Sequence, residues 1–294
     1  MQIIILKKII YIAGLGHSGS TILDMALGAH PKMIGLGEIY AVFNSKDYVS
    51  LFENSTCSCG KKGCDCSFWK DVRSLSESNS STEDKYLQML EMFYKKYGDE
   101  TILVDSSKNS YPYLNILNEK FDLRIIYLTR DYRSWVYSRF TRVKTPLIIL
   151  FLRWFAENKK LLHVLNKQDF KIMKVGYEEL AFFPDFILQK ITDYIDIPFS
   201  DLMVSPANTK SHIINGNIAR ADKQKKEKFY YDSKWLVSGK LSFVAAFFFF
   251  LQKLNNKLVY SNIMKGKVKA FGKKVFDFHI FGNKRKEELD GQHN

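Results

Sequence analysis

Long hydrophobic runs are scarce in this sequence of 294 residues. The longest one after the amino terminus, residues 241–251, is about half of the roughly 20 residues that a membrane-spanning helix needs. The first eight residues are apolar before they are basic and lack a small-residue cleavage site, the reverse of a signal peptide. Internal repeats and low-complexity tracts are also absent. We therefore expect a cytoplasmic protein without a transmembrane segment.

The composition excludes a disordered or fibrous chain. Hydrophobic residues make up 46% of the sequence and aromatic residues 15%, which is enough for a sizeable core. The length suits one large α/β domain with appendages, or at most two domains.

Positive charge is concentrated at the carboxyl end. The formal net charge is +13, and residues 223–294 hold 16 Lys and Arg against 6 Asp and Glu, a net +10. Aromatic and aliphatic residues are interleaved with these lysines, a pattern typical of a basic amphipathic surface that meets an acidic polymer or anionic lipid, here at the inner face of a membrane. A solvated helical face is the alternative. Because no nucleic-acid-binding motif is present, we expect no nucleic acid partner. We separate a main domain, 1–222, from a basic, aromatic-rich C-terminal extension, 223–294.

An incomplete phosphate-binding loop lies near the amino terminus. The apolar run at 9–12 predicts a buried strand, the glycines and serines at 14–19 a tight turn, and apolar residues at helical spacing from Ile22 a helix. Backbone N–H groups and the helix dipole converge on an anion in such a turn. The spacing fits the P-loop pattern G-x-x-x-x-G-K-[ST], but Ser20 replaces the lysine that reaches the β- and γ-phosphates. The loop therefore favours a nucleotide whose transferable group is not a γ-phosphate, with an ordinary strand-to-helix turn as the alternative.

Strands and helices alternate along the rest of the main domain. Strands are predicted at 101–104, 123–129 and 171–175, with helical patterns after each of them. This order is typical of a doubly wound sheet with right-handed crossovers. We predict an α/β fold: a P-loop-like, three-layer α/β/α arrangement with a central, mainly parallel sheet, plus a basic helical C-terminal extension.

Polar residues follow several of these elements. Glu38 comes after a glycine-flanked turn at 35–37, which makes it a candidate general base, although a Glu after a turn also suits the first turn of a helix. Arg130 and Ser138 are eight residues apart across a strand-to-helix junction, so both side chains could reach one phosphate.

All four cysteines form one C-x-C-x4-C-x-C cluster, made of Cys57, Cys59, Cys64 and Cys66. Four thiols so close together are compatible with a structural zinc site in which the glycines supply the turns. Zinc ligand pairs are more often separated by two or more residues, so local disulfides or free thiols stay open as alternatives.

Taken together, these motifs resemble the sulfotransferases that use 3′-phosphoadenylyl sulfate (PAPS), in particular the bacterial branch with a G-x-G-[RH]-S-G-S-T loop. The similarity extends from about Ile9 to Arg220. The segment 128–138 resembles the 3′-phosphate element that contains Arg130 and Ser138, and 176–180 is similar to a Y-E-[DE]-L segment whose tyrosine, here Tyr177, lies near the adenine. Residues 216–220 look like a late G-N-x-x-R loop, in which Arg220 closes on the nucleotide. The loop for the 5′-phosphosulfate would be formed by Gly16, His17, Ser18, Gly19, Ser20 and Thr21.

The resemblance implies transfer of a sulfuryl group from PAPS to a hydroxyl or amine of a carbohydrate, lipid, peptide tyrosine or small molecule. Glu38 resembles the catalytic base of the protein-tyrosine and glycan sulfotransferases, Lys108 is similar to a lysine of those enzymes, and His17 stands where many relatives carry Arg or Lys. Two of the cysteine motifs also recur in this branch, whereas Cys64 is additional.

Two other functions remain open at this stage. A P-loop kinase or NTPase would need a magnesium-binding aspartate, for which only Asp105 is available. In a non-catalytic nucleotide- or membrane-binding module, Glu38 and Lys108 would be ordinary surface charges.

Overall fold

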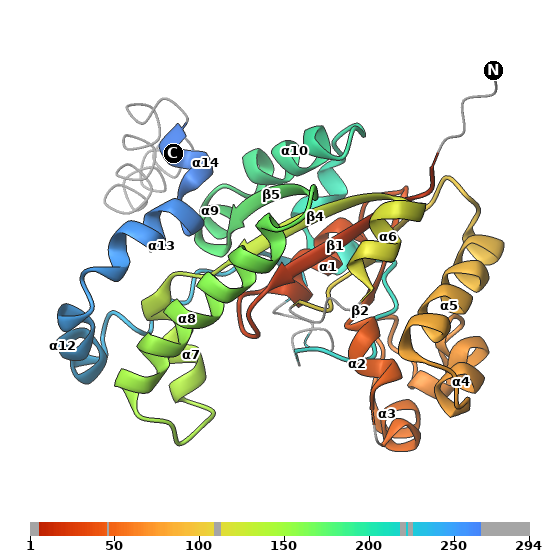
Figure 1. Ribbon diagram of the computed structural model, residues 1–294, viewed down its shortest axis with the longest axis horizontal. Helices are drawn as coiled ribbons and strands as arrows, with labels where there is room; N and C mark the ends of the chain where they lie inside the picture. The colour runs from red at the N-terminus through yellow and green to blue at the C-terminus, as the bar shows by residue number, and fades with distance from the viewer. Residues whose placement is uncertain (1–5, 46, 109–112, 218–221, 223–225, 266–294) are drawn as a thin grey trace, which may run out of the picture.

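A parallel sheet of five strands runs through the centre of the molecule (Figure 1). The structure is a computed structural model that describes residues 6–45, 47–108, 113–217, 222 and 226–265. The strand order is β2-β3-β1-β4-β5, and each neighbouring pair is parallel. This confirms the predicted parallel sheet, whose strands are β1 (Lys8–Gly14), β2 (Met33–Gly37), β3 (Ile102–Asp105), β4 (Asp122–Thr129) and β5 (Lys171–Gly176).

Helices cover both faces of the sheet, which confirms the three-layer α/β/α prediction. Because successive side chains of a strand point to opposite faces, Ile10 and Ile12 of β1 pack with α1 and α10, whereas Ile9 and Tyr11 pack with α5 to α8. The helices of the main domain are α1 (Ser20–Leu27), α2 (Ile39–Phe43), α3 (Tyr48–Asn54), α4 (Trp69–Glu77), α5 (Thr82–Tyr97), α6 (Leu114–Lys120), α7 (Tyr132–Phe140), α8 (Leu147–Asn166), α9 (Tyr177–Phe182) and α10 (Pro184–Tyr194).

The central strand β1 determines where a ligand can bind. Its residues from Ile9 to Ala13 are fully buried, and burying each large aliphatic side chain contributes about 1.5–3 kcal/mol. β3 lies on one side of β1 and β4 on the other. The direction in which strands are added to the sheet therefore reverses beside β1. In open α/β sheets, ligands bind outside the carboxyl ends of the strands at such a switch point.

The segment before Glu38 differs from the prediction. It was predicted to be a glycine-flanked turn, but residues 33–37 form the edge strand β2, paired with β3. Gly35 permits a close approach rather than a turn, because a Cβ at this position would overlap the Asp24 carboxylate and lie 2.6 Å from Ser211 Oγ. The strand thus delivers Glu38 at its carboxyl end.

The C-terminal extension contains the predicted helices, and they pack onto the main domain (Figure 1). Leu241, Leu251 and Leu258 belong to the same hydrophobic cluster as β1. The helices are α12 (Gly239–Phe247), α13 (Leu251–Val259) and α14 (Ser261–Lys265). Residues 266–294, which carry much of the predicted basic surface, lie outside the described residues, and the domain boundary at 222 stays a prediction. In the described part of the chain, no helix is both long and apolar enough to cross a membrane.

Candidate active site

The segment that follows each of the five strands contributes one residue to the lining of a single cavity of about 480 Å³. These residues are His17 after β1, Glu38 after β2, Lys108 after β3, Arg130 after β4 and Tyr177 after β5. The sequence predicted each of these five as a site residue, and the structure brings them together. The other predicted residues that line the cavity are Gly16, Gly19, Ser20, Thr21 and Ser138. Ser18 is buried and does not line the cavity, and Arg220 lies outside the described residues.

The loop between β1 and α1 is held in a strained, open shape. Gly19 at the start of α1 has a φ of 95° and His17 a φ of 72°. A Cβ on Gly19 would overlap the ring of Tyr177, so glycine is required here for close packing as well as for its backbone angle. Trp135 Nε1 donates to the Gly16 carbonyl at 2.8 Å and fixes the loop from the α7 side. The first turn of α1 holds no acidic residue, which leaves its amides available to an anion.

Arg130 lines the cavity directly beside the loop. Its Nε donates to Ser134 Oγ at 2.8 Å, and its Nη1 donates to the His17 carbonyl at 3.2 Å. The guanidinium lies over the ring of Tyr177, 5.3 Å from the ring centre. Ser138 Oγ lies 3.5 Å from His17 Nδ1, so Arg130 and Ser138 reach the cavity beside the same loop residue. The predicted juxtaposition of the guanidinium and the hydroxyl is therefore present.

Glu38 and Lys108, which also line the cavity, form an ion pair between Lys108 Nζ and Glu38 Oε1. Lys108 has a φ of 65°, its N–H donates to the Ile12 carbonyl at 3.1 Å, and its own carbonyl accepts from Tyr11 at 3.2 Å. These two bonds to β1 fix the backbone from which the ammonium projects. Both side chains are largely but not fully buried, which leaves the pair accessible from the cavity.

Burial and charge shift the pKa values of several groups near the cavity. Burial, followed by the positive charges of Arg139 and Arg142, lowers the pKa of His17 to about 4, so this imidazole is neutral at pH 7. Asp105, the predicted magnesium ligand of the kinase alternative, is fully buried, and burial raises its pKa to about 6. It accepts hydrogen bonds from Tyr86 and from Tyr113, and it does not line the cavity. The geometry thus gives the kinase alternative no support.

Several cavity residues were missed by the sequence analysis. Arg139 lies on α7 and Arg142 just after it, and the position of Arg142 four residues after Ser138 was a usable signal. Lys228, Tyr230 and Asp232 come from the predicted extension, and no pattern in the sequence indicated that it would return to the loop. Asp232 Oδ2 lies 3.6 Å from Arg130 Nη2. Ile22 and Asn215 were also missed, whereas Gly216 and Asn217 belong to the predicted late loop at 216–220.

The cysteine cluster differs from the four-thiolate prediction. Cys57, Cys59 and Cys66 converge, but the fourth member of the group is His212. Cys64 lies within the 3-10 turn at 63–65 and outside this group, because that turn carries the chain around to Cys66. The sequence could not reveal His212, which is 146 positions away from Cys66.

A model of the sulfotransferase family matches residues 10–201, which include the loop, Glu38, Lys108, Arg130 and Tyr177. The chain belongs to the sulfotransferase family. This confirms the predicted family, and it supports an enzyme that transfers a sulfuryl group to a hydroxyl or amine.

Three known proteins illustrate this similarity. A putative protein-tyrosine sulfotransferase from Caenorhabditis briggsae is 23% identical over 206 residues, which cover 67% of this chain and 69% of the relative. The sulfotransferase domain of the Synechococcus PCC 7002 olefin synthase matches with a TM-score of 0.46 and 17% identity, over 79% of this chain and 88% of that one. The sulfotransferase domain of the curacin biosynthetic pathway has a TM-score of 0.46 and 18% identity, over 82% of this chain and 97% of that one.

Proposed function

We propose that this sulfotransferase takes its sulfuryl group from PAPS. The observation that carries the proposal is the charge of the cavity. Five cationic side chains line it, against two carboxylates, Glu38 and Asp232, and the loop adds its amides. PAPS carries phosphate groups at both ends of its ribose, so it needs two separated anion sites within one cavity. The five cationic residues are Lys108, Arg130, Arg139, Arg142 and Lys228.

The 5′-phosphosulfate would lie on the loop from Gly16 to Thr21, where amides and hydroxyls replace the charge that a P-loop lysine provides. The 3′-phosphate would bind Arg130 and Ser138 and displace Asp232 from the guanidinium. Arg139 supports an anion on this side, because its Nε is buried and has no hydrogen-bond partner among the described residues. Tyr177, which packs on Gly19, would border the adenine.

Glu38 is our candidate general base. The acceptor oxygen attacks the sulfur in line, the bond to the bridging oxygen breaks, and its electron pair leaves with the 5′-phosphate of adenosine 3′,5′-bisphosphate. Glu38 takes the acceptor proton. Lys108, adjacent to Glu38, stabilises the charge that develops on the leaving side, together with the loop amides, Ser20 and an N–H of neutral His17.

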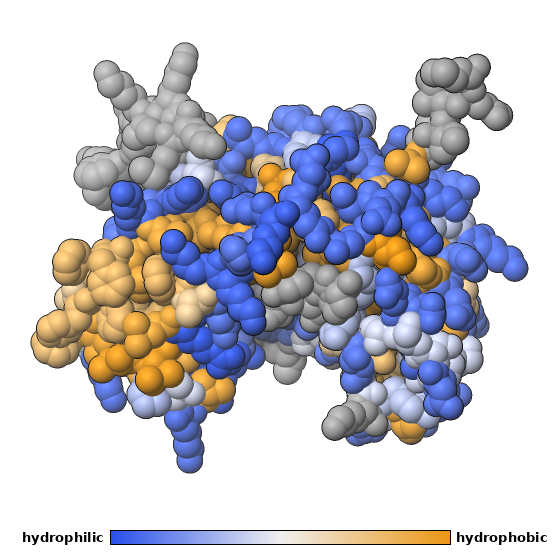
Figure 2. Space-filling model, viewed as in Figure 1, coloured by the Kyte–Doolittle hydropathy of each residue, from blue (hydrophilic) through white to orange (hydrophobic). Residues whose placement is uncertain are grey.

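An exposed apolar patch supports contact with an anionic membrane surface. Figure 2 shows it at lower left, over α12 and the adjoining part of α8. Phe243, Phe247 and Phe249 of this patch are 69%, 66% and 74% exposed, and Ile148 and Ile149 of α8 continue it. Exposed patches of this kind mark interaction sites. Exposed cations that match an anionic surface belong to the same elements: Lys240 lies in α12, Arg153 in α8 and Lys144 shortly before α8.

Transfer of ³⁵S from labelled PAPS tests the proposed function. The full chain is incubated with panels of glycans, lipids, peptides and phenols, and labelled products are separated by chromatography. We expect an acceptor-dependent product with the wild-type chain and a strongly reduced yield with Glu38→Gln. If no acceptor class gives a labelled product, and the protein also does not bind adenosine 3′,5′-bisphosphate, the proposal is contradicted.

A further inference from the structure

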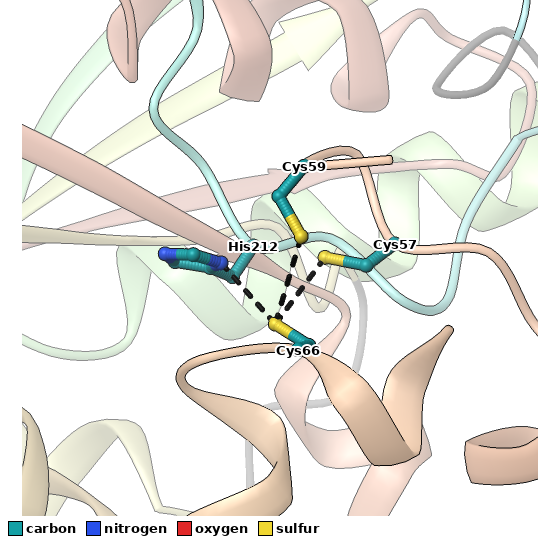
Figure 3. Close-up of side chains that lie close together, drawn as sticks. All are labelled: Cys57, Cys59, Cys66 and His212. Carbon is teal, nitrogen blue, oxygen red and sulfur yellow. Dashed lines mark hydrogen bonds between the residues drawn. The ribbon is translucent and has the colours of Figure 1, made fainter. Parts of the chain in front are cut away.

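Three thiols and one imidazole converge outside the lining of the active-site cavity (Figure 3). Cys57 and Cys59 come from one loop, Cys66 from the start of the segment that leads into α4, and His212 from the extended chain after α10. Their sulfur and nitrogen atoms all lie within 4.8 Å of one another. The group therefore joins two segments that are far apart in the sequence.

The distances within the group match the edges of a zinc tetrahedron. Zinc lies about 2.3 Å from sulfur and about 2.0 Å from a histidine nitrogen, which places two sulfur ligands about 3.8 Å apart and a sulfur and a nitrogen about 3.5 Å apart. Cys66 Sγ lies 3.8 Å from Cys59 Sγ, 3.6 Å from Cys57 Sγ and 3.2 Å from His212 Nδ1. The two sulfur–sulfur distances agree closely with the tetrahedral values, and the sulfur–nitrogen distance is slightly short.

The surroundings orient the imidazole toward the thiols. The ring of His212 lies beside Phe68 and Tyr97, at centroid distances of 6.2 and 6.3 Å, and these two rings also stack on each other. The backbone carbonyl of His212 accepts a hydrogen bond from Trp69 Nε1, and its backbone N–H donates to the Gly35 carbonyl at 2.7 Å. An imidazole packed against an aromatic cluster and fixed through its backbone is an already oriented ligand, as metal sites require.

A nearby cation balances the charge of the group. Three thiolates and one Zn²⁺ carry a net charge of −1, and Lys226 Nζ donates to the Ser58 carbonyl at 3.4 Å, between Cys57 and Cys59 in sequence. Ser58 also binds Ile213 through its own N–H and through its hydroxyl, so the cysteine loop and the His212 segment are held together independently of the metal.

We propose that Cys57, Cys59, Cys66 and His212 bind one structural zinc ion. Four protein ligands close the coordination sphere, which is typical of structural rather than catalytic zinc. The His212 segment continues directly to Asn215 and Gly216 of the active-site cavity, and the Asn217 N–H donates to Thr21 Oγ1 at 3.2 Å. The zinc thus fixes the segment that closes the cavity beside the phosphate loop.

Metal analysis of the purified full chain tests this site, with Cys64 as the matched control. Inductively coupled plasma mass spectrometry should find about one zinc per chain in the wild type and in Cys64→Ser. We expect Cys59→Ser, which changes an exposed side chain, and His212→Gln to hold less than a tenth of that amount. A wild-type chain that carries no zinc and takes none up, or an equal loss in Cys64→Ser, would overturn the proposal.

Two further measurements keep the test independent of folding and of activity. Cobalt should replace the zinc and give the intense visible bands of a tetrahedral site together with thiolate charge-transfer absorption, and Cys59→Ser should lose both. After chelation, four thiols should react under denaturing conditions without reductant. Only two reactive thiols would show a disulfide instead and would contradict the metal site.

Discussion

Asp24 Oδ2 accepts a hydrogen bond from the N–H of Gly37 at 3.1 Å, one residue before Glu38. The same oxygen accepts from Ser106 Oγ at 2.8 Å, two residues before Lys108. A single fully buried carboxyl of α1 therefore connects the strand ends that carry both members of the Glu38–Lys108 pair. Asp24 is a positioning residue, since it touches neither the cavity nor a reacting atom.

Asp24 should also make the stability of the protein depend on pH. Burial raises its pKa from 3.8 to about 8. The folded state then keeps a proton that the unfolded state loses above about pH 4, so this contribution is complete at low pH and is lost as the pH rises toward 8. Asp24→Asn keeps the shape and an acceptor oxygen. We expect the free energy of unfolding of this variant, measured in urea, to fall less steeply with rising pH than that of the wild type. Between pH 5 and 7 the two slopes should differ by up to roughly 1.4 kcal/mol per pH unit. The exposed control Asp169→Asn should behave like wild type.

The 3′-phosphate assignment predicts a selective loss of affinity. Arg130→Ala and Ser138→Ala should weaken binding of adenosine 3′,5′-bisphosphate while leaving adenosine 5′-phosphosulfate nearly unchanged. A charge-assisted hydrogen bond contributes about 1.5–3 kcal/mol, so the arginine change should cost at least tenfold in calorimetric titration. Arg153→Ala, a charge removed from the surface of α8, serves as the control. Equal losses for both nucleotides would mean that Arg130 acts only through its bond to the His17 carbonyl.

Glu38→Gln tests the general base. A positioned base contributes about 10²–10⁴-fold, so kcat should fall by that order while PAPS affinity stays nearly unchanged. Glu53→Gln, an exposed change in α3, controls for the loss of a carboxylate. His17 is the competing base, although its depressed pKa and its place in the loop favour a donor. Near-normal turnover in Glu38→Gln, with activity abolished in His17→Ala, would reverse these roles.

The apolar patch on α12 predicts binding to anionic vesicles. The double change Phe243→Asp and Phe247→Asp should reduce cosedimentation with phosphatidylglycerol vesicles at least tenfold, because each buried aromatic ring contributes about 1.5–3 kcal/mol. Nucleotide affinity should not change. Leu202→Asp, which alters an exposed apolar residue of the 3-10 turn at 201–204 and not of the patch, is the matched control. If both variants bind vesicles as well as wild type does, the patch is not a membrane contact.

The sequence predicted those parts of the fold that depend on local patterns. Apolar runs marked β1, β3, β4 and β5, and the glycine spacing marked the loop, because a buried parallel strand and a tight turn each leave a local signature. The edge strand β2 escaped detection, since Gly35 is explained only by its contact with Asp24 and Ser211. That contact is not visible in a local window.

Contributions from distant segments to the two sites could not be predicted from the sequence. His212 joins the cysteines, and Asp232 reaches Arg130, only because the chain after α10 returns across the carboxyl edge of the sheet. Leu251 and Leu258 likewise looked like part of a basic surface but pack in the main core. Short apolar segments among lysines give the same composition whether they face solvent or a neighbouring sheet.

Isothermal titration of the full chain with adenosine 3′,5′-bisphosphate, and in parallel with ATP and Mg²⁺, tests the central claim most directly. Five cations, an amide-lined loop and no lysine at position 20 should make the bisphosphate bind at one site, at least tenfold more tightly than ATP. The preference should shrink in Arg130→Ala. Tight, magnesium-dependent binding of ATP with no binding of the bisphosphate would contradict the account.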